Sequence, residues 1–170
     1  EIFHIERLPI HGGSLRLHAG HAGAHPVNPS VSALLEEEHH KGINSLPLYL
    51  SFAGQVHQLR SDLLSCVRRL KADGASIAAY GASAKGSTLL NFCELGSQYI
   101  DFVVDRSPHK QGRLTPGTHL PILPPEALLQ RSPDATLLLT WNFQEEILLQ
   151  QSAYRNQGGR FLIPIPSVRL

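Results

Sequence analysis

The chain has 170 residues, of which 42% are hydrophobic and 17% are charged, and 15 Lys and Arg nearly balance 14 Asp and Glu. This composition predicts a folded chain with a core of its own, and a near-neutral chain without a basic cluster among aromatics is not expected to bind nucleic acid. No apolar run approaches the roughly 20 residues that cross a bilayer, and no signal-peptide pattern opens the chain, so membrane insertion is not expected.

Two cysteines, Cys66 and Cys93, are too few and too far apart for a disulfide framework or a zinc site. Both fall in predicted helices, so we expect reduced, buried thiols in a cytoplasmic protein. His18, His21 and His25 lie among small residues without a carboxylate nearby in the sequence. They are a weak ligand set, and the sequence predicts no metal site.

Alternating apolar segments at 1–7 and 15–18 predict a β-hairpin. An isolated hairpin is only marginally stable, so we interpret residues 1–22 as the closing hairpin of an upstream domain. Residues 23–45 begin with small residues and Pro, which predict a linker. A short helix with a charged end is predicted to follow it.

From residue 46 to residue 72, apolar side chains recur at spacings of three and four and predict one long amphipathic helix. Its expected apolar stripe is Phe52, Val56, Leu59, Leu63, Val67 and Leu70.

Strands then alternate with helices up to the last residues of the chain. The predicted strands are 76–80, 99–105, 120–123, 135–141 and 160–165, and the predicted helices between them are 84–95, 124–130 and one that begins at Asn142 and is closed by Gly158 and Gly159. This alternation is typical of a doubly wound α/β fold. We therefore expect residues 46–170 to form a Rossmann-like domain with a mostly parallel sheet of about five strands.

The turn at 81–86 joins the first of these strands to its helix. Gly81 allows a sharp turn, and Gly86 allows the helix to lie close to the sheet. A helix that begins near Ala84 directs free N–H groups at the turn, and Lys85 adds a full positive charge. The turn is therefore predicted to bind an anion such as a diphosphate.

The turn also resembles a dinucleotide fingerprint, with Asp105 after the next strand as the ribose-binding acid. Ser83, however, stands where that fingerprint has its middle glycine, and Lys85 precedes Gly86 where a P-loop has the reverse order. The motif alone leaves the ligand open.

Polar residues follow or flank several predicted strands, and we expect them to meet at one edge of the sheet: 81–85, 105–110, His119 and 140–142. Thr88 and Asn91 are predicted to share the helix face of Lys85, and Asn142 is a candidate cap for the last helix. No Ser-His-Asp order, close carboxylate pair or activated Cys is present, so no catalytic residue is assigned.

The segments at 10–16, 81–91, 104–112, 116–122, 139–143 and 158–166 together carry a family resemblance. The chain resembles the carboxyl-terminal region of S-adenosylmethionine-dependent C-methyltransferases that act on nucleotide-linked keto-deoxysugars. The resemblance implies that a zinc-binding domain and a methyltransferase domain precede this region, and that the nucleotide sugar lies between the methyltransferase domain and the Rossmann-like domain.

In that family a base removes the acidic proton beside a sugar ketone, and the resulting carbon nucleophile takes the methyl group. The resemblance implies that S-adenosylmethionine and the base belong to the upstream domain, so that this chain holds no cofactor and is inactive alone. It implies a substrate-binding role for Lys85 at the diphosphate and for His11, Ser14 and Arg16 near the sugar. The further candidate substrate contacts are Ser83, Thr88, Asn91, His119 and Asn142.

Two other interpretations are a Rossmann module that binds NAD or coenzyme A through 81–86 and Asp105, and a structural domain that dimerises through the helix at 46–72. Binding of a nucleotide diphosphosugar, NAD or coenzyme A distinguishes among the three.

Overall fold

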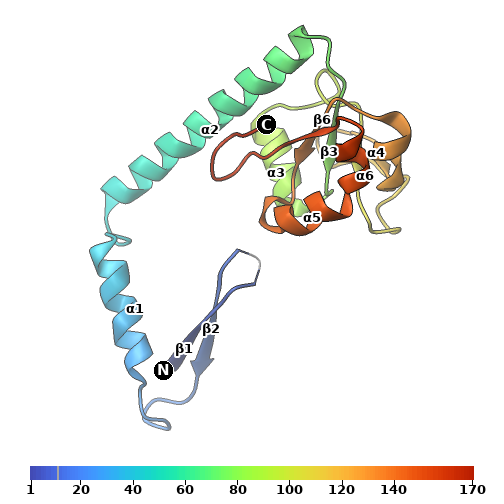
Figure 1. The fold of residues 1–170 in the computed structure, drawn as a ribbon. Coiled ribbons are helices and arrows are strands. Elements are labelled where there is room, and N and C mark those ends of the chain that lie inside the picture. Colours follow the sequence, from blue (N-terminus) through green and yellow to red (C-terminus); the bar gives the residue numbers. More distant parts are fainter. Residues whose placement is uncertain (11) are drawn as a thin grey trace. The chain divides into compact units, whose positions relative to one another are not determined.

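The structure is a computed structural model that describes residues 1–10 and 12–170. The chain divides into two compact units, Glu1–Val56 and His57–Leu170. Figure 1 shows a two-stranded antiparallel sheet in the first unit and a parallel sheet in the second.

The first unit contains a β-hairpin formed by β1 (Ile2–Leu8) and β2 (Ser14–Ala19). Among the described residues, this two-stranded sheet pairs with no further strand. The hairpin predicted from the alternation at 1–7 and 15–18 is confirmed, because a period of two places alternate side chains on opposite faces of a strand.

A short helix, α1 (Pro29–His40), packs against β1. The Asn28 side chain caps it by accepting a hydrogen bond from the N–H of Ser30. Pro29 suits the first helical position because an N–H there would have no partner within the helix. The hydroxyl oxygen of Ser30 accepts a hydrogen bond from the backbone N–H of Ile5, with 3.0 Å between the two atoms, and so fixes the helix to the strand.

The long helix α2 (Leu46–Ala72) has the predicted bounds but not the predicted packing. Its buried side chains all lie in its carboxyl-terminal half, at Leu63, Cys66, Val67 and Leu70. Phe52, which belongs to the predicted apolar stripe, is 63% exposed. The helix passes from one compact unit into the other, and its stripe is buried only where the core of the second unit covers it.

The second unit confirms the predicted doubly wound α/β fold. Its strands are β3 (Ile77–Tyr80), β4 (Val103–Val104), β5 (Ile122–Leu123), β6 (Ala135–Leu138) and β7 (Arg160–Leu162). Among the described residues they form a five-stranded parallel sheet in the order β5-β4-β3-β6-β7. The strand order reverses between β3 and β6, which is where ligands of such sheets bind.

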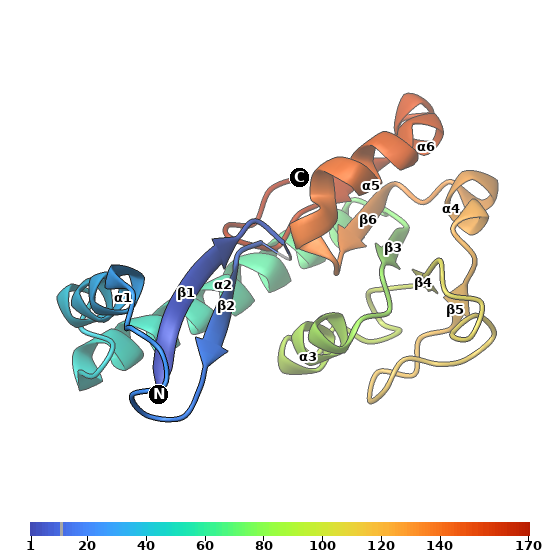
Figure 2. The same cartoon turned by 90° about the horizontal axis from the view of Figure 1, so that it is seen from below.

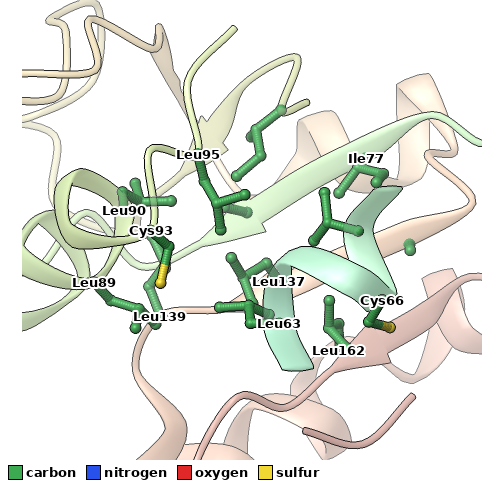
Figure 3. Packing of buried hydrophobic residues seen from close by; sticks show 14 of the residues in the cluster. Leu63, Cys66, Ile77, Leu89, Leu90, Cys93, Leu95, Leu137, Leu139 and Leu162 are labelled. Atoms are coloured by element: carbon green, nitrogen blue, oxygen red, sulfur yellow. The ribbon is translucent and has the colours of Figure 1, made fainter. Parts of the chain in front are cut away.

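Helices cover both faces of this sheet (Figure 2). On one face lie α2 and α3 (Ala84–Phe92), and on the other lie α4 (Glu126–Arg131), α5 (Gln144–Gln150) and α6 (Ser152–Asn156). Side chains of β3 alternate between the two cores, so Ile77 packs with α2 and α3 while Tyr80 packs on the opposite side. Figure 3 shows side chains of α2 and α3 meeting those of the strands.

Several elements differ from the predicted bounds. The strand predicted for 135–141 ends at Leu138, and residues Trp141–Phe143 form a short 3₁₀ helix, η1. The single helix expected to begin at Asn142 is instead η1 followed by α5 and α6.

Cys66 and Cys93 are free, buried thiols, as predicted, and burial raises the pKa of the Cys93 thiol. Throughout residues 1–10 and 12–170, no helix is both long and apolar enough to span a bilayer.

Candidate functional site

The turn after β3 begins with a glycine that no other residue could easily replace. Gly81 has a φ of +94°, and a Cβ added there would lie 2.5 Å from Cγ2 of Thr140. The backbone after β3 therefore lies directly against the segment after β6. These two segments form the carboxyl edge of the sheet at the point where the strand order reverses.

Ser83 and Gly86 build the start of α3. The hydroxyl oxygen of Ser83 accepts a hydrogen bond from the backbone N–H of Gly86, with 3.1 Å between the two atoms, so Ser83 is the N-cap of the helix. A Cβ on Gly86 would lie 2.7 Å from Cβ of Leu139. The predicted close approach of helix and sheet at Gly86 is confirmed.

Lys85 extends from the first turn of α3 to the segment after β6. Its ammonium nitrogen lies 4.5 Å from the centroid of the Trp141 ring and donates a hydrogen bond to Oδ1 of Asn142. The side chain is half-buried, and burial lowers the pKa of Lys85 below that of an ordinary lysine. The predicted proximity of Lys85 and Asn142 is thus confirmed.

The predicted capping role of Asn142 is wrong. The N-cap of α5 is Phe143, and among the described residues no side chain caps that helix. Local sequence favours Asn as a cap, but the side chain of Asn142 accepts a hydrogen bond from Lys85 across the sheet edge. Trp141 is partly buried against the core.

Asp105, which follows β4, is 9% exposed and holds the neighbouring loops in place. One carboxylate oxygen accepts hydrogen bonds from the N–H of Ala82, at 2.8 Å, and from the ammonium of Lys110, at 3.1 Å. The other oxygen accepts a hydrogen bond from the N–H of Ser107, at 2.8 Å. Three of the roughly four acceptor positions of this carboxylate are therefore used within the protein.

A cavity of about 240 Å³ lies at this edge of the sheet. It is lined by Tyr80, Gly81, Asp105, Arg106, Thr140, Phe143, Glu146 and Ile147. The hydroxyl of Thr140 is buried there without a hydrogen-bond partner in the described part of the chain. An unpaired buried hydroxyl costs free energy, which a polar ligand group could recover.

The side chains of Thr88 and Asn91 make their hydrogen bonds away from this edge of the sheet. The hydroxyl of Thr88 donates to the backbone oxygen of Ala84 within α3. The amide of Asn91 donates to the backbone oxygens of Ser87, at 2.8 Å, and Pro116, at 3.0 Å, so it fastens the end of α3 to a loop.

His119 lies at the opposite edge from the one predicted. It precedes β5, and β5 runs parallel to β4, so His119 belongs to the amino ends of the strands. The loop that Asn91 contacts, around Pro116, also precedes β5. A helix that follows a parallel strand runs back along the sheet, which carries Asn91 away from Lys85 and toward this loop.

The hairpin of the first unit carries the other predicted contacts. Ser14 is half-buried and donates to the backbone oxygen of Ile10, while Arg16 donates to the carboxylate of Glu6 at 3.0 Å. His11, the remaining candidate of this group, lies outside the described residues. Ser14 and Arg16 are on one face of the hairpin together with Glu6, which the sequence analysis did not single out.

The parallel sheet, its strand order and the glycine turn at the reversal point define a Rossmann-like α/β domain. Residues 9–166 match the model of the C-methyltransferase C-terminal domain, and the chain belongs to that family. It is 40% identical over 167 residues to C-methyltransferase NovU from Streptomyces niveus. The aligned part is 98% of this chain and 40% of that relative, so the chain spans about 40% of the relative's length.

Proposed function

We propose that this chain is the nucleotide-sugar-binding part of an S-adenosylmethionine-dependent sugar C-methyltransferase that methylates the carbon beside a ketone. The family membership supports the reaction class. The placement of Lys85 at the start of α3, beside the reversal point of the sheet, is the observation that carries the binding role. In this proposal, zinc-binding and methyltransferase domains upstream in the same protein are its partners.

The electrostatics of Lys85 suit a diphosphate. Its ammonium has three donors, of which Asn142 accepts one. Burial disfavours its charged form and lowers its pKa. An anion beside the ammonium would compensate for that loss of solvation, and the positive end of the α3 dipole adds to the attraction.

The same edge does not suit S-adenosylmethionine. The methyl donor carries a positive sulfonium, which Lys85 would repel. The acid that would hold a ribose, Asp105, already accepts hydrogen bonds on both oxygens. We therefore propose no methyl-donor site at this edge, and we expect the 170-residue chain alone to transfer no methyl group. The hydrogen bonds that Asp105 already accepts also argue against the alternative of an NAD or coenzyme A site.

Substitution of Lys85 tests the proposed role in binding. In calorimetric titration with a nucleotide diphosphosugar, Lys85→Ala should weaken binding by about 1.5–3 kcal/mol, the range for a hydrogen bond to a charged group. That is about 10- to 150-fold in Kd. Lys85→Arg should restore only part of the affinity, because a planar guanidinium replaces a compact ammonium.

Lys71→Ala is the matched control. Lys71 lies at the end of α2, before β3 begins, and therefore at the amino edge of the sheet. Its removal should leave the Kd unchanged. Equal effects of the two substitutions, or wild-type binding by Lys85→Ala, would overturn the diphosphate role.

A further inference from the structure

Three potential metal ligands lie together on the hairpin of the first unit. His4 on β1 is directly opposite His18 on β2, and Glu6 is two residues along β1 on the same face. One ligand atom from each residue lies within 4.8 Å of the other two. Oε1 of Glu6 is 3.5 Å from Nε2 of His4 and 3.4 Å from Nε2 of His18.

The two distances that involve Glu6 fit a tetrahedral ion. Zinc binds imidazole nitrogen and carboxylate oxygen at about 2.1 Å, so two such ligands of a tetrahedral ion lie about 3.4 Å apart. The carboxylate oxygen of Glu6 is already at this separation from each of the two imidazole nitrogens. The three side chains are between 34% and 37% exposed, although Nε2 of His18 itself is buried.

Nε2 of His18 lies 3.4 Å from Oε1 of Glu6, but no hydrogen bond joins the two atoms. This nitrogen is buried and has no hydrogen-bond partner among the described residues. The ring centroid of His18 is 5.3 Å from that of His4. A buried nitrogen without a partner costs free energy, whereas a metal ion would use its lone pair.

Ser30 holds His4 in an orientation suited to a ligand. Its hydroxyl oxygen lies 3.2 Å from Nδ1 of His4 and also accepts the backbone N–H of Ile5. If Nδ1 carries the imidazole proton, the hydroxyl accepts both hydrogen bonds and Nε2 of His4 is left with a lone pair toward Glu6. A hydrogen bond of this kind on the outer nitrogen is the usual support of a metal-binding histidine.

Glu6 offers one oxygen to the cluster while the other is held. Oε2 accepts a hydrogen bond from Arg16 at 3.0 Å, so Oε1 is the oxygen that faces the two imidazoles. The guanidinium of Arg16 fixes the carboxylate, although its charge also opposes a cation.

We propose that His4, Glu6 and His18 form a binding site for a divalent transition-metal ion, with Zn²⁺ as the ion best suited to two imidazoles and one carboxylate and with a water as the fourth ligand. We expected no metal because His18 is close to His21 and His25 in the sequence. The structure instead pairs His18 across the hairpin with His4, and His25 stacks on Phe3. The proposal is independent of the Lys85 site.

The test uses the 170-residue chain after removal of metal with a chelator. Titration with Co²⁺ should give visible d–d absorption that saturates at one equivalent, and Zn²⁺ should displace the Co²⁺. His18→Ala and Glu6→Gln should abolish this binding. His21→Ala and His25→Ala are matched controls that should retain it. Ser30→Ala should weaken it by about 10- to 100-fold, the range for loss of an outer-shell partner.

Nuclear magnetic resonance of the unsubstituted chain tests the site without any variant, so its result does not depend on whether the variants fold. With Zn²⁺ at less than one equivalent, the imidazole resonances of His4 and His18 should shift before those of the other eight histidines, since the chain has 10 in all. Binding without fixed stoichiometry, loss of binding in His21→Ala or His25→Ala, or earlier shifts at other histidines would overturn the proposal.

Discussion

The ammonium of Lys85 lies over the ring of Trp141, 4.5 Å from its centroid. The contact joins the first turn of α3 to η1 across the point where the strand order of the sheet reverses. A lysine held this way loses side-chain freedom before any ligand arrives, so less entropy is lost on binding. The contact also gives the proposed anion site an optical reporter, because Trp141 is the one tryptophan in the chain.

Binding of a nucleotide diphosphosugar should change the emission of Trp141 and should weaken at high pH. The diphosphate attracts the protonated form of Lys85, so affinity is fully present below the pKa of this lysine and is lost as pH rises through it. Since burial lowers this pKa, the loss should begin at a lower pH than for an ordinary lysine. Fluorescence titrations across the alkaline range measure this. An affinity independent of pH there would contradict the role of Lys85.

Gly86→Ala should destabilise the protein. A Cβ at this position meets Cβ of Leu139 at 2.7 Å, and overpacking costs about 1–3 kcal/mol, more than the gain of about 1 kcal/mol from replacing glycine in a helix. Gly54→Ala is the control, because Gly54 lies inside α2 with open space around it. Thermal unfolding should show a lower Tm for the first variant and an equal or higher Tm for the second. A raised Tm for Gly86→Ala would contradict a close contact between α3 and the segment after β6.

Ser83→Ala should cost about 1 kcal/mol of unfolding free energy, because the N–H of Gly86 loses its capping oxygen. Thr88→Ala should be neutral or slightly stabilising, since the Thr88 hydroxyl only bonds back to a carbonyl of its own helix. Denaturant unfolding of the two variants checks the difference. Equal stability of Ser83→Ala and the wild type would argue that Ser83 has no capping role.

Periodicity predicted most of the fold. The hairpin, α2 and the alternation of strands and helices follow from spacings of two and of three to four residues, which are local properties of the sequence. The exposure of Phe52 could not be predicted this way, because periodicity marks an apolar face without showing what covers it.

The candidate site was only partly predictable. The turn at 81–86 carries its own chemical signature, and Lys85 was found from it. Asn142 was misjudged because its capping signal is local, whereas its partner, Lys85, is distant in the sequence. His119 was predicted at the wrong edge of the sheet. A residue that precedes a parallel strand lies at the amino edge, whereas a residue that follows such a strand lies at the carboxyl edge. His4 and Glu6 were missed because their cluster depends on the hairpin register with His18.

Calorimetric titration of the 170-residue chain with a nucleotide diphosphosugar, NAD and coenzyme A is the sharpest test of the proposed nucleotide-sugar site. All three ligands carry a diphosphate, so the comparison separates a nucleotide-sugar site from a general dinucleotide site. We expect saturable binding of the nucleotide diphosphosugar, with little or no binding of NAD or coenzyme A. Preferential binding of NAD or coenzyme A, or no binding of the nucleotide sugar, would contradict the proposed site.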